Sequence, residues 1–289
     1  MIAPLSAALE LLRPKHWAKN AFVFMPVPFA LAAGGQLDAP RFALGLVGFC
    51  FVTSAVYAFN DVLDAEQDRR HPQKRSRPVA ARRVGPAFAM ALAVLSLLLG
   101  IGLVALSGHG GAVVIALAYV AINVAYTLGG KHVPLLDVFM LSSGFVLRVL
   151  LGCALIGVRP STWLLLCSST LSLFLALAKR RGDLLRGVGS DHRPSLRGYS
   201  MEFLNQAIAI SAAMTLLGYA LYCMEAKVLR HGREFASFPF VLFGVLDYLR
   251  MSDLKSSGDS PVELILSSPS LWFSGIGWAV ATLWSVGLF

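Results

Sequence analysis

Charged residues and cysteines are both scarce in this sequence. Charged side chains make up 14% of the 289 residues and hydrophobic ones 56%, and only 16 residues are Asp or Glu. The surface of a soluble domain of this size needs more charge, so the composition predicts an integral membrane protein. The four cysteines stand singly in or beside apolar runs, with no C-x-x-C pair. This pattern argues against a disulfide framework and against a cysteine metal site.

We expect no removable signal peptide, because the opening MIAPLSAALELL has neither a basic start nor a clear cleavage site. Apolar runs of roughly bilayer length recur along the chain. They predict an all-α integral membrane fold, with one domain over residues 1–289 and about nine transmembrane helices around a cytoplasm-facing polar cavity. The expected spans are 21–33 (interrupted by Pro26 and Pro28), 42–59, 86–106, 112–126, 135–156, 161–178, 203–224, 235–249 and 271–289.

The distribution of positive charge predicts the orientation of these spans. With a cytoplasmic N-terminus, nineteen Lys and Arg fall in cytoplasmic segments, five fall outside, and Arg148 lies within a span. The excess favours a multi-pass protein of the cell membrane whose two large charged loops, 61–83 and 179–197, are cytoplasmic. Topology and an anionic substrate explain the net charge of +9 better than nucleic acid does.

The segment from Asn60 to Pro78 follows an apolar run and concentrates charge of both signs. Asp61, Asp64 and Asp68 are spaced i, i+3 and i+7, so on a continued helix they share one face. With the side-chain carbonyl of Asn60, they form a set of hard oxygen ligands. Such a set suits Mg²⁺, which keeps some waters and bridges to substrate phosphates.

Basic residues follow the acidic ones. Lys74, Arg75 and Arg77 would oppose the phosphate oxygens that the metal leaves free. Membrane topology alone also explains these cations, and an Asp can simply cap a helix, but neither explains three carboxylates at helical spacing. The segment therefore predicts a diphosphate site with Mg²⁺ as cofactor. Lys19 and Asn20, before the first span, are candidate phosphate ligands or an ordinary interfacial anchor.

Arg148 stands inside the fifth expected span. A charge at the centre of a spanning helix costs roughly 2.5–3.5 kcal/mol on insertion scales, so we expect it to face a cavity and an anion. The alternative is a structural pair with Asp137. Eleven residues separate the two, or about three helical turns, which disfavours direct pairing. We expect both to line the same interior at different depths.

The second charged loop reads KRRGDLLRGVGSDHRPSLRGYS. Lys179 and Asp183 stand at i, i+4 on a helix end, a surface pair worth only about 0.3–0.5 kcal/mol. Arg180 adds to the basic lining. The glycines and proline of residues 187–198 predict a flexible lid over the site.

The motif N-D-x-x-D-x-x-x-D, with the tail H-P-x-K-R-x-R-P, resembles the UbiA superfamily of intramembrane prenyltransferases, which use Mg²⁺ to hold a diphosphate. Other segments resemble its decaprenyl-phosphate phosphoribosyltransferase branch: RPKHWAKN (13–20), YTLGGK with LLD (126–137), GFVLR (144–148), KRRGDL (179–184) and FPFVLFG (238–244). The resemblance covers nearly the whole chain and implies one UbiA-like domain. It adds Tyr126, Lys131 and Asp137 to the expected substrate-binding residues.

This chain departs from the family pattern at three places, and the first of them bears on the activity. Aromatic prenyltransferases of the superfamily are expected to carry a second D-x-x-x-D after the sixth span, where this chain has Lys179 and Asp183. One acidic cluster with an added ammonium suits two phosphorylated substrates better than a diphosphate and a neutral aromatic. His16 stands where the branch is expected to have Gln. Asp247 stands where Arg is expected, which leaves the role of the eighth span open.

The resemblance implies transfer of 5-phosphoribose from phosphoribosyl pyrophosphate to a polyprenyl (decaprenyl) phosphate, with release of pyrophosphate, toward lipid-linked pentose donors for cell-wall arabinan. The expected catalytic residues are Asp61, Asp64, Asp68 and Lys179. Mg²⁺ would neutralise the leaving pyrophosphate, while cations such as Lys131 and Arg148 hold the other phosphates.

The expected partners are the two phosphorylated substrates and the bilayer. The oligomeric state is open, a homo-oligomer included. One alternative activity on the same fold is transfer of a polyprenyl chain from its diphosphate to an aromatic acceptor. Another is a transporter or lipid-binding protein, for which Arg148 and Asp247 provide too few ionisable residues within the spans.

Overall fold

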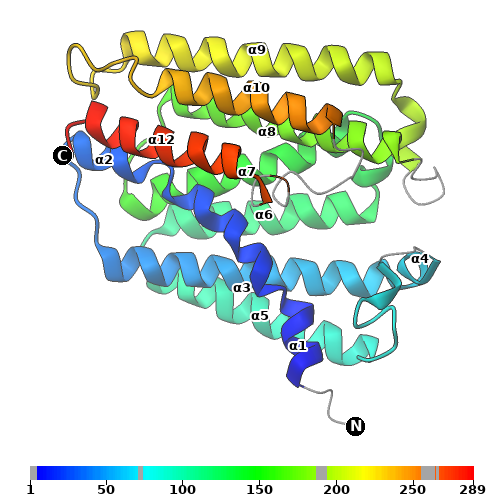
Figure 1. Cartoon of the computed structure of the whole chain (residues 1–289). Coiled ribbons are helices and arrows are strands. Elements are labelled where there is room, and N and C mark those ends of the chain that lie inside the picture. Colours follow the sequence, from blue (N-terminus) through cyan, green and yellow to red (C-terminus); the bar gives the residue numbers. More distant parts are fainter. Residues whose placement is uncertain (1–4, 71–73, 187–193, 255–263, 265–266) are drawn as a thin grey trace. The chain divides into compact units, whose positions relative to one another are not determined.

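The structure is a computed structural model that describes residues 5–70, 74–186, 194–254, 264 and 267–289. Within these residues the chain forms α- and 3₁₀-helices and no strand (Figure 1). The elements are α1 (Leu5–Leu12), η1 (Pro14–Phe24), α2 (Val27–Ala32), α3 (Ala39–Leu63), α4 (Ala65–Arg70), η2 (Lys74–Ser76), α5 (Pro86–Leu106), α6 (Gly110–Leu128), η3 (Gly130–His132), α7 (Leu136–Ile156), α8 (Thr162–Leu185), η4 (Pro194–Gly198), α9 (Met201–Glu225), α10 (Phe238–Leu254) and α12 (Pro269–Ser285).

Six of these helices, α3 and α5 to α9, are long and apolar enough to cross a membrane. The prediction of an all-helical, multi-pass membrane protein is therefore confirmed, whereas the count of nine spans is not. The last two expected spans correspond to α10 and α12, which have 17 residues each. At 1.5 Å per residue each is about 25 Å long, against a hydrocarbon core of about 30 Å. The cytoplasm-facing cavity stays a prediction.

The first expected span, residues 21–33, is not one continuous α-helix. Its first part belongs to η1, a 3₁₀-helix of 11 residues, and its second part is α2, which has only six. Pro26 precedes α2 and Pro28 lies in its first turn. A proline has a fixed φ and no backbone N–H, so the break falls where the two prolines predict it.

The chain divides into two compact units. The first contains residues 1–25, 37–131 and 147–158, and the second contains residues 26–36, 132–146 and 159–289. The helix α7 contributes its first half to the second unit and its second half to the first.

The helix α3 organises the first unit. It is the most buried of the six spans, with 61% of its apolar window buried against 22–44% for the others. It packs along α5 at a close backbone crossing, where Gly48 and Gly100 face each other. Asp38 caps the start of the helix, and its side chain accepts a hydrogen bond from the Arg41 N–H at 3.1 Å. Its other end carries the acidic motif.

In the second unit, α8 packs against α9, and α10 packs against α12 (Figure 1). Serine side chains cap the first turns of three of these helices by accepting a backbone N–H bond. The capping residues are Ser161 for α8, Ser200 for α9 and Ser268 for α12.

Candidate functional site

The acidic motif lies where α3 passes into α4. The backbone N–H of Asp64 donates to the Asn60 carbonyl at 2.9 Å, and that of Asp68 donates to the Asp64 carbonyl at 2.8 Å. Helical hydrogen bonding thus continues across the junction, although regular α-helix stops at Leu63 and resumes at Ala65. This continuity places Asp61 and Asp68 within reach of one shared partner.

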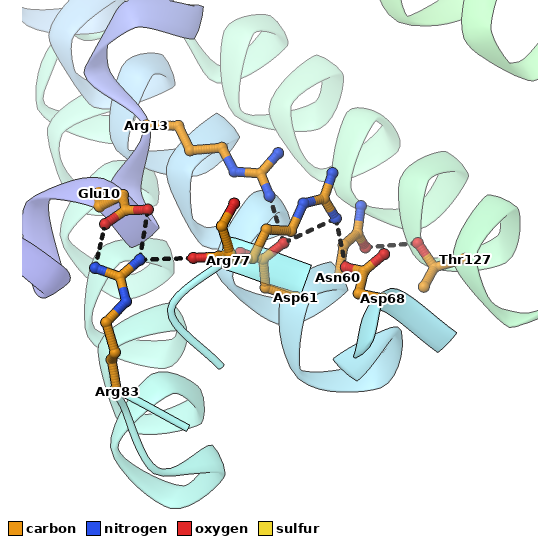
Figure 2. A network of polar contacts seen from close by, with 9 residues as sticks. Glu10, Arg13, Asn60, Asp61, Asp68, Arg77, Arg83 and Thr127 are labelled. Carbon is orange, nitrogen blue, oxygen red and sulfur yellow. Dashed lines mark hydrogen bonds and ion pairs between the residues drawn. The ribbon is translucent and has the colours of Figure 1, made fainter. Parts of the chain in front are cut away.

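That partner is Arg77, which follows η2. Its Nη1 donates to Asp68 Oδ2 at 2.7 Å and to Asp61 Oδ1 at 3.3 Å. Arg13, from the turn between α1 and η1, donates to the same Asp61 Oδ1, so two guanidinium groups converge on one carboxylate (Figure 2). Both aspartates are buried, with exposed fractions of 1% for Asp61 and 3% for Asp68.

The remaining members of the motif are held by residues near the end of α6. Lys131 Nζ, from η3, donates to Asp64 Oδ1. Thr127 Oγ1 donates to Asn60 Oδ1 at 2.5 Å (Figure 2). The first unit therefore brings Lys131 to the acidic motif, and its role in holding a substrate phosphate stays a prediction.

The described residues contain no group of three His, Cys, Asp or Glu placed to hold a metal ion. Each aspartate of the motif is engaged by a cation instead. The donor set nevertheless fits Mg²⁺ chemically, because it consists of carboxylate and amide oxygens. Asp61 Oδ2 is buried and has no hydrogen-bond partner. An unpaired buried carboxylate oxygen is unfavourable, and a divalent cation would satisfy it.

A second polar group of the first unit surrounds Arg148, which is 4% exposed. Its Nε donates to Asn20 Oδ1 at 2.9 Å, and its Nη2 donates to the Tyr119 hydroxyl at 3.0 Å. The guanidinium carbon lies 4.9 Å from the centroid of the Tyr119 ring and 5.8 Å from that of Phe49. These distances are in the range of cation–π contacts. The predicted residues Asn20 and Arg148 therefore meet.

The ring of Tyr57, on α3, lies beside two cations of the N-terminal segment. The Arg13 guanidinium carbon is 5.2 Å from the ring centroid and Lys19 Nζ is 6.0 Å from it. Asn20 contacts α3 farther back, with its Nδ2 3.2 Å from Cys50 Sγ. The segment from Arg13 to Asn20 therefore follows α3 between the Arg148 group and the acidic motif.

Three predicted substrate ligands of the second unit bind one another. Arg180, which is fully buried, donates through Nε to Asp137 Oδ2 at 2.6 Å and through Nη1 to Asp183 Oδ2 at 3.3 Å. Ser195 Oγ donates to Asp137 Oδ2 at 2.9 Å, and the Tyr199 hydroxyl donates to Asp137 Oδ1 at 2.6 Å. Burial, and then the bond to this carboxylate, raise the pKa of Tyr199.

For four other expected residues the structure gives a location but does not assign a role in the site. Lys74 and Tyr126 are half-buried, Arg75 is exposed, and Lys179 is half-buried near the end of α8. Residues 71–73 of the H-P-x-K-R-x-R-P tail and residues 187–193 of the expected lid lie outside the described residues.

Sequence reasoning missed five partners: Arg13, Tyr119, Thr127, Ser195 and Tyr199. Each joins a site residue far away in sequence, as Arg13 does with Asp61 at a separation of 48 positions. Spacing within one helix carries no information on such pairs. The one available signal was that Arg13 lies inside the RPKHWAKN segment.

Comparisons with known proteins place these features in a family. Residues 21–249 match the model of the UbiA prenyltransferase family. The decaprenyl-phosphate phosphoribosyltransferase of Corynebacterium glutamicum is 34% identical over 291 residues, which cover 96% of this chain and 86% of the relative. That of Mycobacterium tuberculosis is 30% identical, with coverages of 96% and 95%.

The fold agrees with this assignment. A UbiA homolog from Archaeoglobus fulgidus, solved with DMAPP and Mg²⁺, matches with a TM-score of 0.72 at 18% identity. The match covers 96% of this chain and 98% of the other. The chain therefore belongs to the UbiA prenyltransferase family, in the branch of its relatives called decaprenyl-phosphate phosphoribosyltransferase.

Proposed function

We propose that this protein transfers 5-phosphoribose from phosphoribosyl pyrophosphate to a polyprenyl phosphate, the decaprenyl lipid of its relatives, and releases pyrophosphate. The observation that carries the proposal is the acidic motif at the end of α3, where Asp61, Asp64 and Asp68 meet Arg77 and Lys131. Oxygen ligands and phosphate-binding cations within one unit suit a diphosphate. Relatives that match nearly the full length of the chain are named decaprenyl-phosphate phosphoribosyltransferase, and their name indicates the pentose and the lipid as substrates.

The reaction forms a bond between an oxygen of the lipid phosphate and C1 of the ribose, and breaks the bond from C1 to the pyrophosphate. Asn60, Asp61, Asp64 and Asp68 would hold Mg²⁺, which neutralises charge on the leaving pyrophosphate when it is bound. Asp61 Oδ2, buried and without a hydrogen-bond partner, is the best-defined ligand atom of this set.

The side chains of this chain supply the rest of the electrostatics. Arg77 is placed to turn from the carboxylates to the pyrophosphate oxygens, and Lys74 lies three residues before it in η2. Positive charge develops on the ribose near C1 as the bond breaks. The acceptor is already an anion, so it needs positioning more than a general base. Arg148, with Asn20 and Tyr119 around it, is a candidate for holding a second phosphate.

The charged loop after α8 supports pentosyl transfer over prenyl transfer to an aromatic. The position of the first aspartate in a second D-x-x-x-D is occupied by Lys179. Asp183, at the last position, accepts from Arg180 at 3.3 Å and from Arg186 at 2.7 Å. A cation in place of a carboxylate removes a metal ligand and adds a phosphate contact.

The test is a transfer assay with the purified full-length chain in lipid nanodiscs. We expect phosphoribosyl pyrophosphate, Mg²⁺ and a long polyprenyl phosphate to give a lipid-linked phosphoribose, detected by mass spectrometry, with one pyrophosphate per product. Asp64→Asn should lower turnover at least about a hundredfold, because a metal ligand and the partner of Lys131 are both lost.

The matched control is Asp38→Asn, which changes the exposed cap at the other end of the same helix and should leave turnover within about twofold. Prenylation of an aromatic acid without any phosphoribosyl lipid would favour the alternative activity. Full turnover by Asp64→Asn would remove that residue from the site.

A further inference from the structure

Each carboxylate of the acidic motif is already paired with a cation. Arg77 bridges Asp61 and Asp68, and Lys131 holds Asp64. Arg13 adds a second guanidinium to Asp61 Oδ1 (Figure 2). The groups expected to bind a metal and the groups able to bind phosphate oxygens therefore bind each other.

The backbone conformation of Arg13 is an unusual one that its surroundings must hold in place. Its φ of 51° and ψ of 57° lie in the left-handed region, where residues other than glycine carry a cost and persist only when their surroundings hold them. Its side chain is 16% exposed and lies over the ring of Tyr57. Arg13 also precedes η1, which carries Lys19 and Asn20.

These ion pairs oppose either ligand arriving alone. A divalent cation must separate the carboxylates from Arg13, Arg77 and Lys131, and it leaves those cations without partners. A diphosphate must draw the same cations away and leaves Asp61 and Asp68 unneutralised beside each other. Separating a buried pair by removing one partner is strongly unfavourable. When both ligands arrive, the carboxylates turn to the cation and the basic side chains turn to the phosphate oxygens, so every charge keeps a partner.

We propose that Arg13 is a further diphosphate-binding residue of this site, and that Arg13, Arg77 and Lys131 make the site take up a divalent cation and a diphosphate together, by exchange of ion-pair partners. The proposal rests on the proposed function for the location of the site, but it does not depend on transfer of the pentose.

Arg13→Gln tests the proposal through two binding measurements. The affinity for the metal is expected to rise and the affinity for pyrophosphate is expected to fall. The binding of Mn²⁺ without diphosphate is measured from the loss of the electron paramagnetic resonance signal of the free ion. It should become roughly five- to tenfold tighter, because a competing cation is gone. Retention of radiolabelled inorganic pyrophosphate at saturating Mg²⁺, measured by equilibrium dialysis, should become at least about tenfold weaker because a charged contact is lost.

Two further variants separate this role from a structural one. Arg13→Lys keeps the charge and should lie between wild type and Arg13→Gln in both measurements, so it also serves if the glutamine variant does not fold. Arg83→Gln removes one positive charge from the same part of the unit. Arg83 pairs with Glu10 at 2.7 Å and donates to the Ser76 carbonyl at 2.7 Å, but it does not bind Asp61 or Asp68 (Figure 2). Its loss should therefore change either affinity by at most about twofold.

Two results would overturn the proposal. One is a parallel loss of both affinities in Arg13→Gln with a lowered unfolding temperature, which indicates a purely structural residue. The other is that the wild type binds Mn²⁺ tightly without pyrophosphate, binds pyrophosphate equally well without a divalent cation, and shows the same Mn²⁺ affinity as Arg13→Gln. Coupled binding without any phosphoribosyl lipid in the transfer assay would uphold this inference and defeat the proposed function.

Discussion

The buried pair of Arg180 and Asp137 is predicted to matter more for stability than for binding. Both side chains have an exposed fraction of 0%, and Ser195 and Tyr199 complete the hydrogen bonds of the carboxylate. We expect Asp137→Asn to lower stability by roughly 3 kcal/mol, because the buried Arg180 guanidinium loses the nearer of its two carboxylates and keeps only Asp183, at 3.3 Å. Thermal unfolding in detergent should show a midpoint about 10 °C lower.

Asp253 supplies the matched control for that experiment. It pairs with Arg181, the neighbour of Arg180, but its side chain is 64% exposed. Asp253→Asn removes the same charge from a solvated pair and should cost at most about 1 kcal/mol. Equal unfolding midpoints for the two variants would contradict a structural role for Asp137 and restore it as a candidate substrate ligand.

At the scale of residues, the sequence predicted what one helix brings together and little else. The spacing of Asp61, Asp64 and Asp68 is a local property, so a helical period was enough to group them. The anion expected near Arg148 stays a prediction, and the sequence did not predict its contacts with Asn20, 128 positions away, and with an aromatic ring. Pairs of this kind depend on the packing of separate helices.

At the scale of elements, the crossing of α3 and α5 depends on two glycines. A Cβ added to Gly48 would lie 2.7 Å from the Gly100 carbonyl oxygen, and a Cβ added to Gly100 would lie 2.7 Å from that of Gly48. Backbone on the opposite helix cannot move aside as a side chain does. Gly48→Ala should therefore separate the two helices and cost at least roughly 1–3 kcal/mol, read from the unfolding midpoint.

Gly102 is the control for this crossing, because it lies on the same helix α5 with no atom within 4 Å of an added Cβ. Gly102→Ala should be neutral or slightly stabilising, since alanine loses less backbone entropy than glycine in a helix. Unchanged stability in Gly48→Ala would mean that the two helices do not approach as closely as the structure has them.

The N-terminal segment explains why element types were harder to predict than element positions. Hydrophobicity located residues 21–33, but it could not distinguish an α-helix from the 3₁₀-helix η1 followed by the short α2. A 3₁₀-helix of 11 residues is unusual, and long runs of this type often mark strain or function. Here it follows Arg13, with its left-handed backbone, and carries Asn20, so side-chain contacts with α3 hold a geometry that propensity does not favour.

At the scale of the whole molecule, composition alone predicted the class of protein. A chain with 14% charged residues and repeated apolar runs has few alternatives to a helical membrane protein. The number of spans was less certain, because α10 and α12 are each 17 residues long and lie at the lower limit of a membrane span. The point within α7 at which the two units divide was not predicted from the sequence.

Orientation is the remaining property of the whole molecule that charge predicts. The excess of Lys and Arg predicts that the loop after α3 is cytoplasmic and that the loop before α10 is outside. Arg75 and His231 are exposed representatives of these two loops. We expect Arg75→Cys to react with a membrane-impermeant maleimide in inside-out vesicles and not in intact cells, and His231→Cys to do the reverse.

The unmodified chain controls for its own thiols in this experiment, because three of its four cysteines are buried and Cys167 is half-buried.

The orientation also constrains the proposed chemistry. Phosphoribosyl pyrophosphate is a soluble, highly charged molecule that does not cross a bilayer unaided, so a site built from Asp61, Asp64 and Asp68 must open toward the side that contains it. Labelling of Arg75→Cys from outside the cell would therefore contradict the predicted topology and the proposed donor together.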